Sequence, residues 1–472
     1  MSDSTTAAST HKASRHEITI IGVVLAGAFL AILNQTVLSP ALPKLMETFS
    51  INAGMAQWVT SIYLLVNGIM VPISAFLIDR FSTRKLFFAS MGVFVVGTVV
   101  CAMAPSFEIL IVGRVLQAAG AGVQLPLVAV VPMLIFPPEK RGTAMGIAGI
   151  VMSVAPAAGP VVAGIIIDAM GWRAMFWSIA PLGLITLIAA IFLLGNVGEL
   201  KNPHLDIPSV LLSTVAFGGL LYGFSSASTL GWGSPAVIIS IIAGAICFVF
   251  FILRQKKLEE PLLQIKTLKS NVFATSAIIV TLINCAAAVT NVTLPIFLQN
   301  VLGASALDTG MVMMPAAAVG IILSPLSGVI FDKFGPRGIS VVGLLIMTLA
   351  LFGFSRITSD ATLATAAILC TLMATGQTLA NMPVNTWGIN ALSNDMIAHG
   401  NAISNTGRQV GGAICTALIV TIMTMVTANN ANLGVAESTC AGIQAAYFAC
   451  AVIAALALIF AIIKVRNTKK EA

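Results

Sequence analysis

Residues 74–85 of the chain read SAFLIDRFSTRK, and residues 328–337 read GVIFDKFGPR. Each stretch is a charged turn between two long apolar runs. Each has an acid, Asp79 or Asp332, directly followed by a base. Two matching charged turns in so apolar a chain indicate two related halves. We therefore expect the chain to repeat one structural plan, with the turn at the same place in each half.

The composition assigns the chain to the membrane proteins. Of its 472 residues, 58% are hydrophobic and 9% are charged, whereas about 25% of the residues in a soluble domain are charged. A helix needs roughly 20 apolar residues to cross a bilayer, and many runs reach that length. These runs are too long and too continuous for the alternating strands of a membrane barrel. We therefore predict an all-α polytopic membrane protein.

Fourteen apolar runs are predicted to cross the membrane as helices. In chain order they are residues 18–40, 53–78, 86–104, 107–135, 141–168, 174–195, 207–227, 234–254, 271–300, 307–331, 338–356, 360–392, 397–426 and 441–464. Loops rich in Lys and Arg stay on the cytoplasmic side. Of the loop bases, only Lys44, Arg173 and Arg356 fall on the other side when both termini are cytoplasmic. This placement accounts for the net charge of +7 without a nucleic-acid partner.

The two charged turns lie at equivalent places once the seventh and eighth runs are set aside. Each then follows the second helix of a set of six, and repeats of this kind are known in carriers that bind substrate between the repeats. The predicted organisation is a cytoplasmic tail (1–17), an N-terminal six-helix bundle (18–200), an inserted helix pair (201–257), a C-terminal six-helix bundle (258–464) and a second cytoplasmic tail (465–472).

Both turns follow a motif in which a glycine precedes an acid by four residues and a second glycine and further bases come after it. The turn at 328–337 has all of these residues, namely Gly328, Asp332, Lys333, Gly335 and Arg337. The turn at 74–85 has Ala75 and Ser82 at the two glycine positions. It keeps the charged residues Asp79, Arg80, Arg84 and Lys85.

Three further motifs lie inside the apolar runs. The fourth run carries GRVLQAAGAG, with Arg114, Gln117 and Gly120. The fifth carries GIAGIVMSVAPAAGPVVAG, and the thirteenth carries NTGRQVGGA. With these motifs and both turns, the chain resembles the major facilitator superfamily, specifically its fourteen-helix drug:proton antiporters. The resemblance covers nearly the whole chain and implies two six-helix bundles that alternately open to the two sides of the membrane.

The charged turns are expected to form a gate on the cytoplasmic side. An acid at the end of one helix can pair with bases of the next loop or of a neighbouring helix, and such pairs would hold this side closed. Topology alone is the alternative, but it explains the bases and leaves the repeated acid unexplained. The expected gate residues are Asp79, Arg80, Arg84, Lys85, Asp332, Lys333 and Arg337.

The fifth run is expected to act as a hinge and seal between the halves. Small residues let helix backbones approach closely in membranes, and proline bends a helix by removing a hydrogen bond. Close packing alone is the alternative explanation, and the resemblance to antiporters adds the link to transport. The hinge residues are Gly146, Gly159, Pro160 and Gly164.

Charges inside the membrane are costly and are therefore functional candidates. Arg114 and Arg408 are the two predicted buried charges. The first run resembles an antiporter motif, but Asn34 replaces its acid, and in this it is similar to lincomycin-resistance-type members of the family. No acid lies at the middle of a run. The proton-coupling candidates are therefore Arg114 and acids near the run ends, namely Asp79, Glu108, Asp168 and Asp308.

Polar side chains recur at helical spacing in several runs and predict a wet cavity between the halves. Hydrogen bonding between helices is the alternative explanation for any one of them. The cavity candidates are Asn34, Gln57, Asn67, Gln117, Asn284, Asn291, Asn381 and Asn385.

The predicted function is proton-coupled export of amphipathic small molecules across the bacterial plasma membrane by a monomer. Its expected partners are small-molecule substrates, protons and the lipid bilayer. Two alternatives stay open: a carrier, including an importer, for one lipid, peptide or metabolite, and a membrane scaffold without transport activity. The sequence has no nucleotide-binding motif, catalytic constellation or Cys/His spacing of a metal site. We therefore expect neither an enzyme nor a cofactor or metal.

Overall fold

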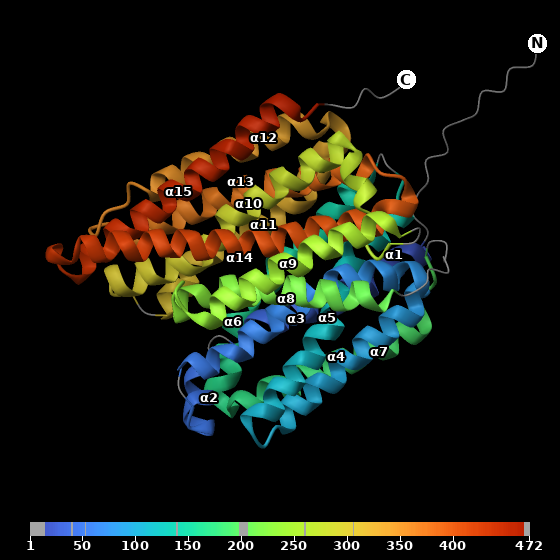
Figure 1. Ribbon diagram of the computed structural model, residues 1–472, viewed down its shortest axis with the longest axis horizontal. Coiled ribbons are helices and arrows are strands. Elements are labelled where there is room, and N and C mark those ends of the chain that lie inside the picture. The colour runs from blue at the N-terminus through green and yellow to red at the C-terminus, as the bar shows by residue number, and fades with distance from the viewer. Residues whose placement is uncertain are drawn as a thin grey trace, which may run out of the picture.

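The protein is helical throughout the part of the chain that its computed structural model describes (Figure 1). The described residues are 15–466, apart from 39–40, 52, 138–139, 198–205, 259–260 and 305. The prediction of an all-α protein is confirmed for this part. Its helices gather around two large apolar cores, one in each half of the sequence.

The first core is formed by the helices of the N-terminal half. Its fully buried aromatic side chains include Phe87, Phe94 and Phe176. The helices are α1 (Arg15–Thr36), α2 (Leu42–Phe49), α3 (Ala53–Arg80), α4 (Thr83–Met103), α5 (Phe107–Ile135), α6 (Arg141–Met170) and α7 (Trp172–Leu193).

The second core is formed by the helices of the C-terminal half. At its centre the rings of Phe354 and Tyr447 stack with their centroids 4.5 Å apart. The helices are α10 (Asn271–Ile296), α11 (Ala306–Phe334), α12 (Pro336–Phe354), α13 (Leu363–Asn390), α14 (Ile397–Asn429) and α15 (Val435–Lys464). Short helical turns are η2 (Ile265–Lys269), η3 (Phe297–Val301), η4 (Asn394–Met396) and η5 (Ala431–Leu433).

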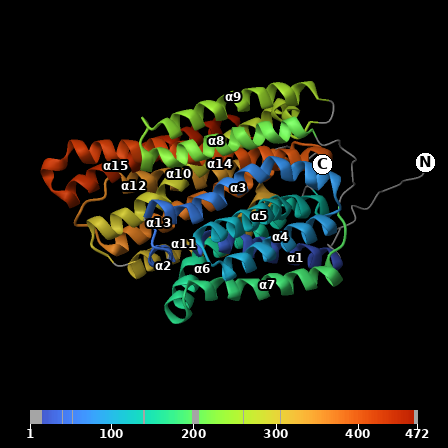
Figure 2. The same cartoon turned by 60° about the horizontal axis from the view of Figure 1, so that its bottom comes forward.

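The predicted inserted pair, α8 (Ile207–Leu230) and α9 (Pro235–Lys257), lies over the boundary between the two halves (Figures 1 and 2). On one side the ring of Tyr222 stacks on Trp58 of α3, with centroids 5.4 Å apart. On the other side the Trp232 indole N–H donates to the Thr421 hydroxyl of α14 at 2.7 Å. The pair therefore contacts both halves.

Twelve helices in the described residues are long and apolar enough to cross a membrane. They correspond to all of the predicted runs except 53–78 and 141–168. Helix α3 counts as a thirteenth if its segments Trp58–Met70 and Ile73–Arg80, which are bent by 52° to each other, form one span. In α6, which covers the remaining run, several side chains lie outside the described residues. The described part thus supports twelve spans, or thirteen, where fourteen were predicted.

Helix α1 begins and α15 ends on the same side of the molecule, at the right of Figure 1. We call this side the terminal end. Because the long helices run alternately away from it and back to it, both charged turns lie there.

Candidate functional site

At the terminal end the two halves meet through buried apolar side chains. The first half contributes Ala129, Val130 and Met133 of α5 and Met145 of α6, and the second contributes Phe273, Ile389, Leu392, Ile397 and Ala398. Apolar side chains packed in this way leave no room for water between the halves. The structure is therefore closed at its terminal end.

Asp332, the acid of the second charged turn, binds the start of α6 in the other half. Its carboxylate accepts hydrogen bonds from the backbone N–H groups of Gly142 (3.0 Å) and Thr143 (2.8 Å) and from the Thr143 hydroxyl (2.6 Å). The first N–H groups of a helix have no partners within the helix, and Lys140, the residue before α6, offers no side-chain cap. A carboxylate at this place also complements the helix dipole. Asp332 of α11 thus caps a helix of the opposite half.

Asp79, the acid of the first turn, contacts His399 in the first turn of α14. The distance from His399 Nε2 to Asp79 Oδ2 is 3.2 Å, and the two side chains are 7% and 14% exposed. A neutral imidazole with its proton on Nε2 donates a hydrogen bond here, and a protonated imidazole adds an ion pair. This contact therefore joins two groups that can each change charge by taking up a proton.

The two acid contacts are equivalent between the halves. Each acid ends the second long helix of its half and reaches the fifth long helix of the other half. Thr143 and His399 are both the third residue of that fifth helix. Sequence reasoning missed both residues. The repeat itself was the signal that could have identified them, because matching positions in the two halves take matching roles.

A third polar connection between the halves starts at Arg141, the first residue of α6. Its guanidinium donates from Nη2 to Asn394 Oδ1 (2.9 Å) and from Nη1 to Asn390 Oδ1 (3.4 Å). The residue is 4% exposed. Sequence reasoning singled out no role for Arg141, because its role between the halves depends on the packing of α6 against α13.

Glycines allow α6 and α11 to approach each other closely next to these contacts. A Cβ atom added to Gly328 would overlap the carbonyl oxygen of Gly142, and one added to Gly146 would lie 2.7 Å from the carbonyl oxygen of Ser324. Both obstacles are backbone atoms, which cannot rotate away. The expected hinge residue Gly146 thus lies at the contact between the halves.

The other expected hinge residues do not lie at this contact or are not described. A Cβ atom on Gly159 would overlap Thr36 of α1, so this glycine packs within its own half. The side chain of Pro160 and the surroundings of Gly164 lie outside the described residues.

One arginine of each turn binds near the end of another helix in its own half. Arg84 Nη2 donates to the Ile191 carbonyl of α7 at 2.7 Å, and Arg337 Nη2 donates to the Ile462 carbonyl of α15 at 3.4 Å. Cations are favourable at helix C-termini, where carbonyl groups lack partners. The remaining expected gate bases, Arg80, Lys85 and Lys333, are exposed. In each turn, then, the acid contacts a helix of the opposite half, and an arginine contacts a helix of its own half.

The turns also differ in backbone in a way that explains their different residues. Gly335 has φ +78°, a conformation that favours glycine, and directly precedes α12. Ser82, at the equivalent place, has φ −59°, and its hydroxyl accepts from the Lys85 N–H as a cap of α4. The serine therefore replaces the glycine by capping the helix.

Arg114 is fully buried inside the first half, as predicted. Its guanidinium donates to the carbonyl oxygens of Val59 (3.0 Å) and Asn34 (3.2 Å) and to Gln117 Oε1 (3.0 Å). It also lies 4.3 Å from the centre of the Tyr63 ring, a favourable cation–π distance. These contacts tie α5 to α1 and α3, so Arg114 organises the first core.

The polar cavity candidates fall into two separate groups. In the second half, Asn284 Nδ2 donates to Asn381 Oδ1 at 3.4 Å, and Asn385 lies one turn further along α13. In the first half, Gln117 donates to the Thr98 hydroxyl between α4 and α5, and Asn34 is fully buried beside Arg114. The structure therefore groups these candidates by half.

Three other cavity candidates stand apart from both groups. Asn67 is 3% exposed on α3, Asn291 is exposed, and the side chain of Gln57 lies outside the described residues.

Two other proton-coupling candidates, Glu108 and Asp308, lie away from the closed end, and the second predicted buried charge, Arg408, lies in α14. Glu108 is exposed in the first turn of α5, and Asp308 is half-buried in the first turn of α11. The side chain of Asp168 lies outside the described residues. Arg408 is half-buried in α14. Asp79 differs from the exposed Glu108 in that its carboxylate lies against a second titratable side chain, His399.

Comparisons with known proteins agree with this architecture. The family model described as Major Facilitator Superfamily matches residues 24–416. The chain is 45% identical over 435 residues to the uncharacterized MFS-type transporter YcnB of Bacillus subtilis, covering 92% of each chain. It is 37% identical over 406 residues to the lincomycin resistance protein LmrB of Listeria monocytogenes, covering 86% of each. The solved structure of the human organic anion transporter MFSD10 has a TM-score of 0.66 at 14% identity, with 94% of this chain and 99% of that chain covered.

Proposed function

The chain belongs to the Major Facilitator Superfamily, and on that premise we propose that it is a proton-coupled exporter of amphipathic small molecules. It is a transport protein and not an enzyme. Its similarity to a lincomycin resistance protein supports export of foreign compounds from a bacterial cell. We place it in the plasma membrane as a monomer. Both termini are placed in the cytoplasm, because the loop bases gather at the terminal end.

The proposed topology has fourteen spans. Helix α3 would be one span despite its bend, and α6 another, in addition to the twelve that meet the length and hydropathy criteria. Two six-helix bundles (18–200 and 258–464) and an inserted pair (201–257) then place every charged turn in the cytoplasm. The two separate apolar cores support the division into bundles.

The contact between Asp79 and His399 is the observation that carries the proton-coupling proposal. These side chains hold the two halves together at the closed end and are 3.2 Å apart. A proton that reaches the Asp79 carboxylate removes its charge and weakens its attraction to His399. The closed end then separates towards the cytoplasm, where the proton leaves and the substrate enters. Loss of the proton restores the contact and returns the carrier to the closed form with its substrate facing outward.

The resident polar groups suggest how substrates are held. The amides of Asn284 and Asn381 offer both donors and acceptors within the second half, and no acid fixes one charge type at the middle of the spans. Such a site suits molecules with an apolar body and a few polar groups. This property agrees with export of compounds of varied structure.

The test uses purified protein in proteoliposomes with an imposed pH gradient. A panel of cationic, neutral and anionic amphipathic compounds, including lincomycin, should move in the direction opposite to the proton flow. Asp79→Asn should abolish the gradient-driven movement, whereas Asp360→Asn, at an exposed acid in a loop, should leave it intact. Movement that ignores the gradient would refute proton coupling, and flux of one metabolite alone would refute export of varied compounds.

A further inference from the structure

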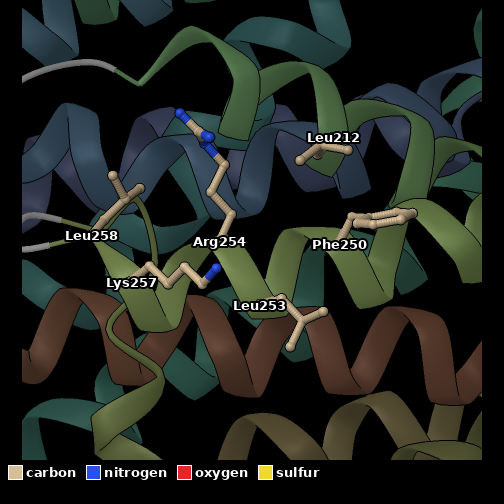
Figure 3. A pocket seen from close by; sticks show the side chains of 6 residues that line it. All are labelled: Leu212, Phe250, Leu253, Arg254, Lys257 and Leu258. Carbon is tan, nitrogen blue, oxygen red and sulfur yellow. The ribbon is translucent and has the colours of Figure 1, made fainter.

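A groove on the inserted helix pair combines an apolar floor with two cations. Its cavity of about 440 Å³ is lined by Leu212 of α8 and by Phe250, Leu253, Arg254, Lys257 and Leu258 at the end of α9 (Figure 3). This volume is within the range of small-ligand sites, roughly 300–1,000 Å³. The groove lies at the terminal end, where α9 leaves its apolar span.

The apolar side of the groove faces away from the protein. Phe250 and Leu253 are 57% and 50% exposed. Along the most apolar stretch of α9, 17% of the residues are buried inside the protein. In a membrane-spanning helix, such a surface is covered by fatty acyl chains. The groove therefore meets lipid on its apolar side.

The cation Arg254 is held in place by an acid at the start of α8. Its Nε and Nη2 donate to the two carboxylate oxygens of Asp206 at 2.6 and 2.7 Å. The guanidinium hydrogen bond lowers the pKa of Asp206 to about 2, so this carboxylate stays charged at neutral pH. Asp206 thus fixes the orientation of the guanidinium through two of its nitrogens and leaves Nη1 outside the pair.

The second cation, Lys257, is exposed and has its ammonium group turned back towards Leu253 (Figure 3). More bases follow close by: Lys256, Lys266 and Lys269 are all exposed. The stretch 254–269 also contains the acids Glu259 and Glu260, which lie outside the described residues, and its bases outnumber them. The end of the groove next to the water therefore attracts anions.

We propose that this groove binds an anionic glycerophospholipid of the cytoplasmic leaflet. One acyl chain lies along Leu212, Phe250 and Leu253, and the lipid phosphate binds the Lys257 ammonium and the Nη1 edge of Arg254. Basic pockets between spanning helices on the cytoplasmic side suit acidic head groups. Because α8 contacts both halves and α9 packs on α8, the bound lipid lies against the pair that covers the boundary between them.

The proposal is tested by native mass spectrometry of the full-length protein released from membranes of mixed composition. With phosphatidylglycerol and phosphatidylcholine of equal chain length, phosphatidylglycerol should be the lipid that is retained. One interfacial base contributes about 1 kcal/mol to anionic lipid binding, so Lys257→Gln should reduce retention about fivefold. Lys269→Gln, which removes an exposed base outside the groove, is the matched control and should have little effect.

A second variant tests the apolar side of the groove. Leu253→Ser should also reduce retention of phosphatidylglycerol, because it removes acyl-chain contacts while leaving the bases in place. Thermal melting of each variant shows whether it remains folded. Equal retention of the two lipids, equal loss in Lys257→Gln and Lys269→Gln, or normal retention in folded Leu253→Ser would each overturn the proposal.

Discussion

At the scale of single residues, the most informative position is His399. It is buried at the boundary between the halves and contacts Asp79. Its counterpart Thr143 hydrogen-bonds to Asp332 with a hydroxyl, which does not titrate at physiological pH. The imidazole therefore gives one of the two equivalent contacts a second titratable group, whereas the other contact has the Asp332 carboxylate alone.

We predict that His399→Gln keeps transport near neutral pH but flattens its dependence on pH. A glutamine amide can still donate a hydrogen bond to Asp79, yet it cannot take up a proton. Transport rates measured between pH 5.5 and 8 should vary at least about threefold less than in the unaltered protein, because a glutamine amide has no proton to gain or lose. His399→Phe, which cannot donate, should lose transport altogether. A pH profile of His399→Gln that matches the unaltered protein would contradict this role.

The sequence indicated which residues are functional candidates, but it did not indicate which atoms they contact. Arg114 was identified as a buried charge because an arginine in an apolar run is rare. Two of its acceptors are the main-chain carbonyls of Val59 and Asn34. Every residue has such a carbonyl, so no sequence pattern could indicate which ones an arginine would bind.

At the scale of helices, the contact between α6 and α11 depends on glycine. Gly328 and Gly142 lie so close that a single methyl group on Gly328 would overlap backbone atoms of α6. Alanine is otherwise the better helix former, by about 1 kcal/mol. A loss of stability in a Gly328→Ala variant would therefore reflect the close packing of α6 against α11.

We predict that Gly328→Ala destabilises the protein by about 1–3 kcal/mol, the usual cost of overpacking, and lowers transport at least tenfold. Gly338→Ala is the matched control, because a Cβ atom at Gly338 meets nothing within 4 Å. Thermal unfolding in detergent and transport in proteoliposomes measure the two effects. Equal behaviour of the two variants would show that α6 and α11 can move apart without cost.

Helix positions could be predicted well because hydrophobic runs have clear ends. The predicted run 107–135 coincides with α5, and 271–300 corresponds to α10 with η3. The bend within α3 and the short helix α2 were not foreseen, since both depend on how the first half packs. The role of Ser82 as a cap appears only in the structure, because the turn motif has a glycine at this position and a serine there indicates no particular contact.

At the scale of the whole molecule, the closed end is held by contacts that run in both directions between the halves. Asp332 binds α6, and Asp79 binds α14. The sequence indicated two halves and the acids that join them. It could not place α8 and α9 over the boundary, because a repeat pattern contains no information about where an insertion packs.

We predict that Asp332→Ala shifts the protein towards a form open at its terminal end. A lost helix cap costs about 0.5–2 kcal/mol, which corresponds to a change of up to about thirtyfold in the balance between forms. Spin labels at positions 85 and 333, which are exposed on opposite halves, would show longer distances in a variant whose native cysteines have been replaced. Asp360→Ala should leave the distances unchanged. Unaltered distances in Asp332→Ala would mean that the apolar cluster suffices to keep this end closed.

The presence of two equivalent contacts has a consequence for leakage. A passage held shut by one titratable pair would open whenever a stray proton arrived, and the membrane gradient would be dissipated without useful work. Here a second contact, from the backbone amides of Gly142 and Thr143 to the Asp332 carboxylate, joins the same two halves. Protonation at Asp79 therefore loosens the barrier, and full opening also requires the Asp332 contact to separate. The inherited duplication thus provides a safeguard against idle cycling.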